Sequence, residues 1–293
     1  MELALRTDKQ PSALRNRLRG IKEKLFGREI PPWPVMPYDT VELTYWKPVQ
    51  GVNFGDELSR TITQLMLARR GVTIQDEVPV SKQLLAIGSV LHHAREGAII
   101  WGSGVNGSTY AWQYRQREID VRAVRGPRTR DFLSKLGITV PEIYGDPAIL
   151  LPELTNGRFS ATGRDAIAFV PNLHDMEMVG SAGTGDIRII DPKRSWNVVV
   201  KDILECRFVL ASSLHGLVVA DAFGIPARYV RLSEREGLFK YADYYEGTGR
   251  PLEYATSLDQ AREMGGHAKP VIDKQALMDA FPYDIWDVSA KNT

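Results

Sequence analysis

Four short segments combine a charged residue or a histidine with glycine where an apolar run gives way to a helical pattern. They are VNFGDE (52–57), AVRGPRTR (123–130), IYGDPA (143–148) and LASSLHG (210–216). The start of a helix offers free N–H groups and the positive end of a dipole, so it can bind an anion. A histidine at such a start, His215, can contact the anion and transfer a proton. We therefore expect acid–base chemistry on an anionic substrate.

These residues also have purely structural interpretations. Asp56 and Asp146 could be helix N-caps, each stabilising its helix by about 1 kcal/mol. Either Ser212 or Ser213 could cap the helix that follows, and His215 could be a buried histidine with satisfied hydrogen bonds. A residue that caps a helix can also face a ligand, so both interpretations stay open at this point.

Arg125 directly precedes the Gly-Pro pair that opens a predicted helix, so we expect its guanidinium to face the anion-binding edge. Arg128 and Arg130 are expected on a solvated basic face. The loop GSGVNG (102–107) follows a strand but matches neither a dinucleotide-binding nor a Walker motif, so it is only a weak phosphate-loop signal. The sequence contains no GxSxG elbow, HExxH motif or cysteine cluster, so serine-hydrolase and zinc chemistry have little support.

Strand-like and helix-like runs alternate from about residue 40 onward, which predicts parallel sheets with helices on both faces. In such sheets ligands bind at the carboxyl ends of strands, where the helices begin, and the four segments all fall there. The polar stretch 155–165 predicts a domain boundary. We expect an α/β fold of two Rossmann-like domains, 39–155 and 160–293, with a cleft between them and a terminal helix on the second.

The N-terminal segment, 1–38, combines a basic amphipathic pattern with a proline-rich linker. Residues 12–28 carry six basic residues and one acidic residue, with apolar residues at helical spacing. Such a helix can lie on an anionic membrane surface, or it can pack on the protein with a solvated charged face.

The overall composition is that of a globular protein, with a net charge of +1 that argues against nucleic-acid binding. The single cysteine, Cys206, precludes an intrachain disulfide and is typical of a reducing compartment. The first ten residues carry charges where a signal peptide needs an apolar core, and no run approaches the roughly 20 apolar residues of a membrane helix. We therefore expect a soluble, cytoplasmic protein.

The motifs NFGDELS, GSGVNG, DVRAVRGPRTRDFL, YGDPAIL, SSLHGLVVADAFGIPA and KYADYYEGTGR follow one another in this order. Together they resemble the polysaccharide pyruvyltransferase family, and most of all its ketal-forming branch in xanthan-type and succinoglycan-type exopolysaccharide synthesis. The resemblance spans about residues 45–287. It implies a GT-B-like fold and phosphoenolpyruvate as a co-substrate rather than a cofactor. Separately, the sequence shows no metal-binding pattern, so we expect no metal site.

The resemblance further implies that the acceptor is the terminal hexose of a lipid-linked oligosaccharide and that the product is a cyclic pyruvate ketal, typically at O4 and O6. Phosphate is released. The basic helix 12–28 would then dock the enzyme peripherally on the inner face of the plasma membrane.

By this resemblance, His215 is expected to be the acid or proton shuttle, and either Asp146 or Asp56 the base or an orienter of sugar hydroxyls. Residues expected to bind phosphoenolpyruvate are Arg125, Ser212, Ser213, Gly216, Gly104, Asn106, His92 and Lys240. Residues expected to bind the acceptor are Asn53, Tyr241, Tyr244, Tyr245 and Arg250. The aromatic loop 239–249 suits a sugar platform, although ordinary packing would explain it equally well.

One position departs from the family pattern. Many members carry an arginine two residues before the motif histidine, where this chain has Ser213. Another residue must then bind the donor phosphate, and the candidates are His92, His93, Lys240 and Arg250.

Two other functions remain as alternatives. A GT-B glycosyltransferase with a nucleotide-sugar donor would share the fold, but no clear glutamate for a ribose follows the GIP segment at 224–226. A non-catalytic sugar-binding or scaffolding protein predicts that His215→Ala retains full function.

Overall fold

The structure is a computed structural model that describes residues 36–48, 51–107, 111–114, 118–163, 166–179 and 185–287. Asp39–Thr293 form one compact unit, which contains every element described below. The predicted basic helix at 12–28 lies outside the described residues. No helix among those that are described is both long and apolar enough to cross a membrane.

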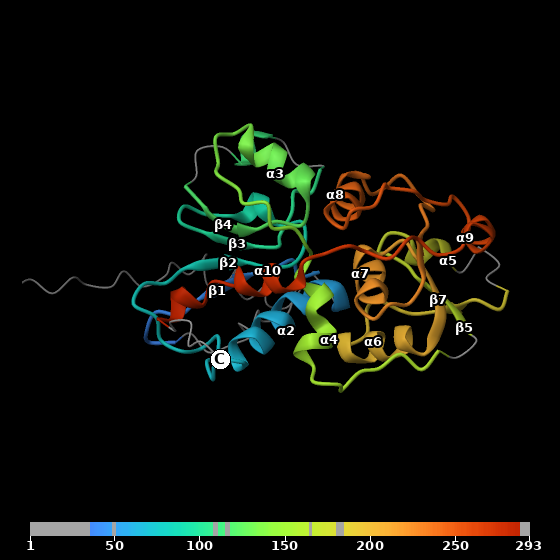
Figure 1. Cartoon of the computed structure of the whole chain (residues 1–293), viewed down its shortest axis with the longest axis horizontal. Helices are drawn as coiled ribbons and strands as arrows, with labels where there is room; N and C mark the ends of the chain where they lie inside the picture. Colours follow the sequence, from blue (N-terminus) through green and yellow to red (C-terminus); the bar gives the residue numbers. More distant parts are fainter. Residues whose placement is uncertain are drawn as a thin grey trace, which may run out of the picture. The chain divides into compact units, whose positions relative to one another are not determined.

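The described residues form two four-stranded parallel sheets (Figure 1), as the alternating pattern predicts. The first sheet has the order β1 (Glu42–Thr44), β2 (Gln83–Leu85), β3 (Ile99–Trp101) and β4 (Asp120–Ala123), with Leu84 opposite Leu43 on one side and Ile99 on the other. The second has the order β6 (Arg188–Ile189), β5 (Ala166–Val170), β7 (Cys206–Ala211) and β8 (Ala227–Tyr229), with Ala168 opposite Val209. These sheets are consistent with Rossmann-like folds, and a division into separate domains near 155–160 stays a prediction.

Helices cover the sheets. Several of them occupy the helical runs of the sequence, whereas residues 239–247 form a helix where a loop is expected from the sequence. The helices are α2 (Phe54–Ala68), α3 (Pro127–Ser134), α4 (Leu151–Leu154), α5 (Met176–Val179), α6 (Trp196–Leu204), α7 (Leu214–Ala222), α8 (Phe239–Gly247), α9 (Leu258–Met264) and α10 (Lys274–Asp279). Short 3-10 helices are η1 (Leu91–His93), η2 (Ala111–Tyr114), η3 (Pro147–Leu150) and η4 (Tyr283–Trp286).

Neighbouring residues of a strand enter different cores, because side chains alternate across a sheet. Leu84 belongs to the core that contains Ile62 of α2, whereas Leu85 belongs to the core that contains Leu133 of α3. Figure 1 shows α2 and α3 on opposite sides of this sheet. Both faces are therefore covered, as parallel sheets require.

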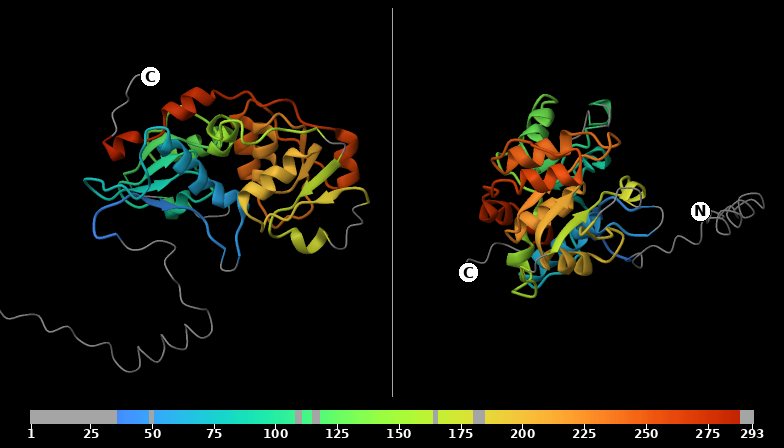
Figure 2. Two further views of the ribbon diagram at one scale, coloured as in Figure 1. Left: turned by 90° about the horizontal axis from the view of Figure 1, so that it is seen from below. Right: turned by 90° about the vertical axis from the view of Figure 1, so that its right-hand side faces the viewer.

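The C-terminal segment returns to the first sheet. The indole of Trp101 in β3 donates a hydrogen bond to the carbonyl of Leu277 in α10 at 2.8 Å, and α10 is the red helix over this sheet in Figure 2. The predicted single terminal helix is instead interrupted after α10 and followed by η4, since Pro282 has no N–H to continue a helix.

The strand order of the second sheet contains a topological switch. The chain leaves β5 toward β6 on one side and later returns to the other side as β7. Such a switch opens a crevice at the carboxyl ends of the two central strands, where open α/β sheets bind ligands. These ends are Val170 of β5 and Ala211 of β7. The strands of the first sheet follow one another in sequence order and have no such switch.

Candidate active site

His215 lies where the starts of two helices meet. Ser213 is the N-cap of α7, and its Oγ accepts a hydrogen bond from the Gly216 N–H at 3.3 Å. Asn53 is the N-cap of α2, and its Oδ1 accepts from the Gly55 N–H, also at 3.3 Å. A Cβ on Gly55 would stand 2.1 Å from Nδ1 of His215, so only glycine allows the imidazole to lie against the first turn of α2. The ring is therefore held between two helix N-termini.

Asp146 lies behind His215 and is fully buried. It is the N-cap of η3, and its Oδ1 accepts from the Ala148 N–H at 3.0 Å. Its Oδ2 is 3.5 Å from Nε2 of His215, and neither atom has a hydrogen-bond partner among the described residues. A carboxylate in this position can orient the ring and stabilise its protonated form, but it does not line the pocket in front of the ring.

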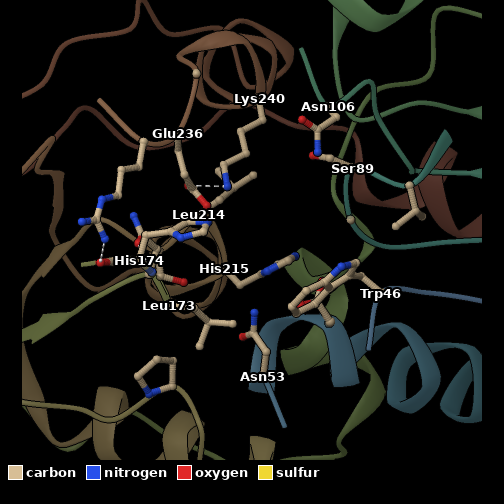
Figure 3. Close-up of a pocket in the computed structure, with 18 of the residues that line it drawn as sticks. Trp46, Asn53, Ser89, Asn106, Leu173, His174, Leu214, His215, Glu236 and Lys240 are labelled. Atoms are coloured by element: carbon tan, nitrogen blue, oxygen red, sulfur yellow. Dashed lines mark hydrogen bonds and ion pairs between the residues drawn. The ribbon is translucent and has the colours of Figure 1, made fainter. Parts of the chain in front are cut away.

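A pocket of about 410 Å³ opens in front of His215 (Figure 3). Its lining comes from the carboxyl ends of strands in both sheets and from the segment before α8. Four of the five histidines of the chain line it: His92, His93, His174 and His215. Within the described part of the chain, no group of three or more histidine, cysteine or acidic residues is arranged to hold a metal ion. The pocket therefore brings four imidazole side chains together.

Asp56, in the first turn of α2, supplies a carboxylate to this pocket. Burial raises its pKa to about 6; the charges of Asp146 and Glu236 act in the same direction, and those of His215 and Lys240 oppose them. No described residue donates a hydrogen bond to it. It is not the helix cap, because Asn53 has that role. Asp56 is therefore suited to accept a proton near neutral pH.

Lys240 brings a positive charge to the pocket from α8. Its Nζ lies 2.5 Å from the carboxylate of Glu236, and both side chains are 21% exposed. Burial would raise the pKa of Glu236, but the charge and hydrogen bond of Lys240 and the hydroxyl of Tyr241 outweigh it and lower the pKa. That hydroxyl lies 2.7 Å from Glu236 and 2.6 Å from the carbonyl of Ser212, which connects the pair to the start of α7.

Arg125 does not face the pocket, which corrects the expectation from the sequence. Its side chain is fully buried. Its Nε donates to Asp243 at 3.0 Å, one Nη to Ser89 Oγ at 2.7 Å and the other to the Val105 carbonyl at 2.8 Å. Gly104 is also absent from the pocket lining, since a Cβ there would stand 2.4 Å from the guanidinium of Arg125. Both residues are packed inside the protein.

The start of α3 is closed by a carboxylate of the chain itself. Asp243 of α8 accepts hydrogen bonds from the N–H of Thr129 at 2.9 Å and from its hydroxyl at 2.7 Å. A Cβ on Gly126, the N-cap position, would stand 1.8 Å from the Asp243 carbonyl oxygen, so α8 packs directly on this turn. The anion that Arg125 and this helix start attract is therefore Asp243.

The predicted sugar platform is also corrected. Residues 239–247 form helix α8, in which Tyr241, Tyr244 and Tyr245 are buried and do not line the pocket. Their spacing places them on one helix face, which packs into the core. Arg250 is buried as well, in an ion pair with Asp221 at 2.6 Å, and Tyr244 donates to the same carboxylate at 2.8 Å. Ordinary core packing therefore explains the aromatic residues of this segment.

Most of the other predicted residues come together. The pocket is lined by His215, Asp56, Asn53, Ser213, His92, Asn106 and Lys240, while Ser212 and Gly216 are buried beside it in the β7–α7 turn. Trp46, Asn172 and His174 also line the pocket, although no motif in the sequence pointed to them. They follow β1 and β5, so the strand-end rule that selected the other residues could have found them.

The sequence of this chain is similar to those of known proteins. Over residues 13–234, more than half of the chain, the sequence matches the family described as Polysaccharide pyruvyl transferase. The Succinoglycan biosynthesis protein ExoV of Rhizobium meliloti (strain 1021) is 31% identical over 220 residues, 70% of this chain and 64% of that protein. The Uncharacterized protein L143 of Acanthamoeba polyphaga mimivirus is 26% identical over 191 residues, 62% of this chain and 65% of that protein.

The chain thus spans slightly less than two thirds of the length of these two relatives. The crystal structure of an uncharacterized protein from Klebsiella pneumoniae subsp. pneumoniae NTUH-K2044 superposes with a TM-score of 0.44 and 11% identity, over 80% of this chain and 94% of that one. On the family match and the identity to ExoV, this chain belongs to the polysaccharide pyruvyl transferase family.

Proposed function

We propose that this protein transfers pyruvate from phosphoenolpyruvate to a terminal hexose of a lipid-linked exopolysaccharide repeat unit, forming a cyclic ketal, as a 4,6-bridge, and releasing phosphate. The observation that carries the proposal is His215, held between two helix starts with Asp146 behind it and a histidine-rich pocket in front. Family membership and the name of ExoV, a succinoglycan biosynthesis protein, support it. The two-domain, GT-B-like organisation is part of the same proposal.

The donor end of the pocket is the region around Lys240. Phosphoenolpyruvate carries a phosphate and a carboxylate, which require cations and N–H donors close together. Lys240, His92 and His174 line the pocket and can supply them, together with the start of α7. Lys240 is the candidate that takes the place of the family arginine at Ser213, because Arg250 is buried against Asp221. No cofactor or metal is required.

The reaction balances with proton transfers alone. A proton joins the methylene carbon of phosphoenolpyruvate, and the first sugar hydroxyl adds to the resulting cationic C2 and gives its proton to a base. The bond from C2 to the phosphate oxygen then breaks. The second hydroxyl adds to C2, and its proton leaves with the phosphate. Two C–O bonds form, one breaks, and nothing is oxidised or reduced.

The site residues divide these tasks. His215 is the acid for the methylene carbon, because it lines the pocket at the start of α7. Asp56 is the base for the sugar hydroxyl, because it lines the pocket and its pKa is raised to about 6. Asp146, which is buried behind the ring, positions His215.

A lipid-linked acceptor places the reaction at the inner face of the plasma membrane. The basic pattern at 12–28 is suited to peripheral binding there, and lies outside the described residues. Deletion of residues 1–30 is expected to reduce binding to anionic liposomes, measured by cosedimentation. Unchanged binding would overturn this part of the proposal.

The first test is phosphate release from phosphoenolpyruvate in the presence of lipid-linked repeat units. We expect acceptor-dependent release that His215→Ala lowers by about 10²- to 10⁴-fold, the usual contribution of a general acid. His267→Ala is the matched control, because His267 is the one histidine that does not line the pocket among the residues the structure describes. A His215→Ala variant with full function would point to the scaffolding alternative.

A thermal-shift comparison separates the two enzymatic alternatives. Phosphoenolpyruvate should raise the melting temperature of a pyruvyltransferase, because a ligand that binds only the native state stabilises it. Stabilisation by a nucleotide-sugar, and not by phosphoenolpyruvate, would favour the glycosyltransferase.

A further inference from the structure

Trp46 is a large, solvent-exposed aromatic side chain that lines the pocket. It follows β1, it lines the pocket, and 44% of its surface is exposed. Isolated exposed apolar residues are ordinary on protein surfaces. Apart from the histidines, Trp46 is the one aromatic side chain among the described residues that line this pocket, whose other apolar lining residues are aliphatic, and its exposed indole offers a flat apolar face to a ligand.

Trp46 and the charged end of the pocket lie on different sides of the catalytic ring. In Figure 3 the imidazole of His215 points toward the indole of Trp46, whereas Lys240 and Glu236 enter from the other side. Asn53 caps α2, and the ring of His215 lies against the first turn of that helix. A group bound over Trp46 would therefore be within reach of the acid and would stay clear of the Lys240 end.

We infer that Trp46 is the stacking platform for the acceptor hexose, an inference that rests on the proposed function. The face of an aromatic ring carries partial negative charge, which repels the trianionic donor and attracts the polarised C–H groups on one face of a pyranose. The buried tyrosines of α8 cannot take this part, because none of them lines the pocket.

Polar groups beside Trp46 suit the rim of a sugar. Oδ1 of Asn53 accepts from the Gly55 N–H, while its Nδ2 has no partner among the described residues and can donate to a hydroxyl. Asp56, one helical turn along, can accept from another hydroxyl. Stacking would thus hold the ring while O4 and O6 face the acid and the base.

The test measures how methyl glycosides of glucose, galactose and mannose bind to the full chain. Binding is detected by tryptophan fluorescence and by calorimetry. We expect at least one glycoside to bind with a fluorescence change. Trp46→Phe should lose that change and keep calorimetric affinity within about threefold, and Trp46→Ala should weaken affinity about tenfold. The control is Trp196→Phe, since Trp196 packs on Phe159 away from the pocket and the signal should persist.

Two outcomes would overturn the inference: no glycoside binds, or binding and its signal are unchanged in Trp46→Ala. This assay contains no phosphoenolpyruvate, so it is independent of the transfer reaction. A glycoside that binds through Trp46 while no phosphate is released with any acceptor would leave the platform in place and reject the proposed chemistry.

Discussion

Two helices, α3 and α7, begin at the carboxyl ends of parallel strands with a basic residue beside the first turn. Arg125 precedes α3, and His215 is the second residue of α7. At α3, the carboxylate of Asp243 occupies the helix start and pairs with the guanidinium. At α7, the first turn faces a pocket of about 410 Å³. The protein's own carboxylate therefore occupies the start of α3, whereas the start of α7 is open to the pocket.

The difference between these two helix starts shows that a helix start predicts a bound anion. It does not predict whether that anion is a carboxylate of the protein or a ligand. Asp243 is 118 residues from Arg125 along the chain, so no local pattern announces the pair. A buried charge needs a partner because its desolvation costs several kcal/mol. Where the chain supplies the partner, the site contributes to folding. At the start of α7 no carboxylate of the described chain occupies the first turn, which therefore faces the pocket.

The largest expected effect is at the closed helix start. Arg125→Met leaves the Asp243 carboxylate buried without its ion pair, so we expect the free energy of unfolding to fall by about 3–5 kcal/mol. Urea denaturation measures it. The affinity of the remaining folded protein for phosphoenolpyruvate should change less than twofold.

Arg128→Met is the matched control for this change. Arg128 pairs with Glu246 at 2.6 Å on the surface, where both side chains are more than a third exposed. Such pairs contribute about 0–1 kcal/mol, so the control should unfold nearly like the wild type. If Arg125→Met were equally stable and lost donor binding instead, the closed start would be a second ligand site.

In the pocket that the start of α7 faces, Asp56→Asn in the first turn of α2 is expected to increase stability at pH 7. The pKa of Asp56 is raised to about 6 in the folded protein, so the folded state holds its proton more tightly than the unfolded state. Stability is therefore lost as pH rises from about 4 to about 6, and the loss persists above that range. Two pKa units correspond to at most about 3 kcal/mol. Melting temperatures at pH 4 and pH 8 measure the difference.

The same substitution should remove most of the activity, because asparagine cannot accept the hydroxyl proton. In the wild type, kcat should rise with pH through about 6 as the carboxylate ionises. Asp191→Asn, in the loop after β6 and outside the pocket lining, is the control for both measurements. A variant that is stabilised and fully active would remove Asp56 from the chemistry.

The smallest expected effects concern the charge pair at the donor end. Lys240→Met should weaken phosphoenolpyruvate binding about tenfold, since one charge-assisted contact is lost. Glu236→Gln should act in the opposite direction by a few-fold, because it removes the internal anion that holds Lys240 at 2.5 Å. Calorimetric titration with phosphoenolpyruvate measures both, with the exposed Lys201→Met as control. Equal losses in the two variants would mean that the pair is structural.

The periodicity of the sequence was sufficient for most elements. Continuous apolar runs predicted the parallel strands, and α2, α3, α6 and α7 lie where helical spacing begins. The strand-end rule selected His215, Asp56 and Asn53, which the structure brings to one pocket. These predictions succeed because backbone geometry and side-chain alternation are local properties.

The predictions for Arg125, Gly104 and the α8 tyrosines failed for a common reason. Each concerns a side chain that could face either a ligand or the interior, and the choice depends on what packs against it. From the sequence alone, the tyrosine rings of α8 could either stack on a sugar or pack in the core. The structure shows that they pack in the core. Trp46 was missed because the motif that drew attention after β1 was the helix start at 52–57, whereas Trp46 lies earlier in the loop that connects β1 to α2.

By itself, the sequence determined the α/β class, the helix starts and the histidine placed at one of them, because hydrophobic periodicity and turn chemistry act over a few residues. Only the tertiary structure decided that Asp243 fills the start of α3, that Asp146 stands behind His215, and that Trp46 stays open. Those outcomes depend on contacts between segments about 70 to 120 residues apart, for which burial and pairing of charge, rather than local propensity, set the energy.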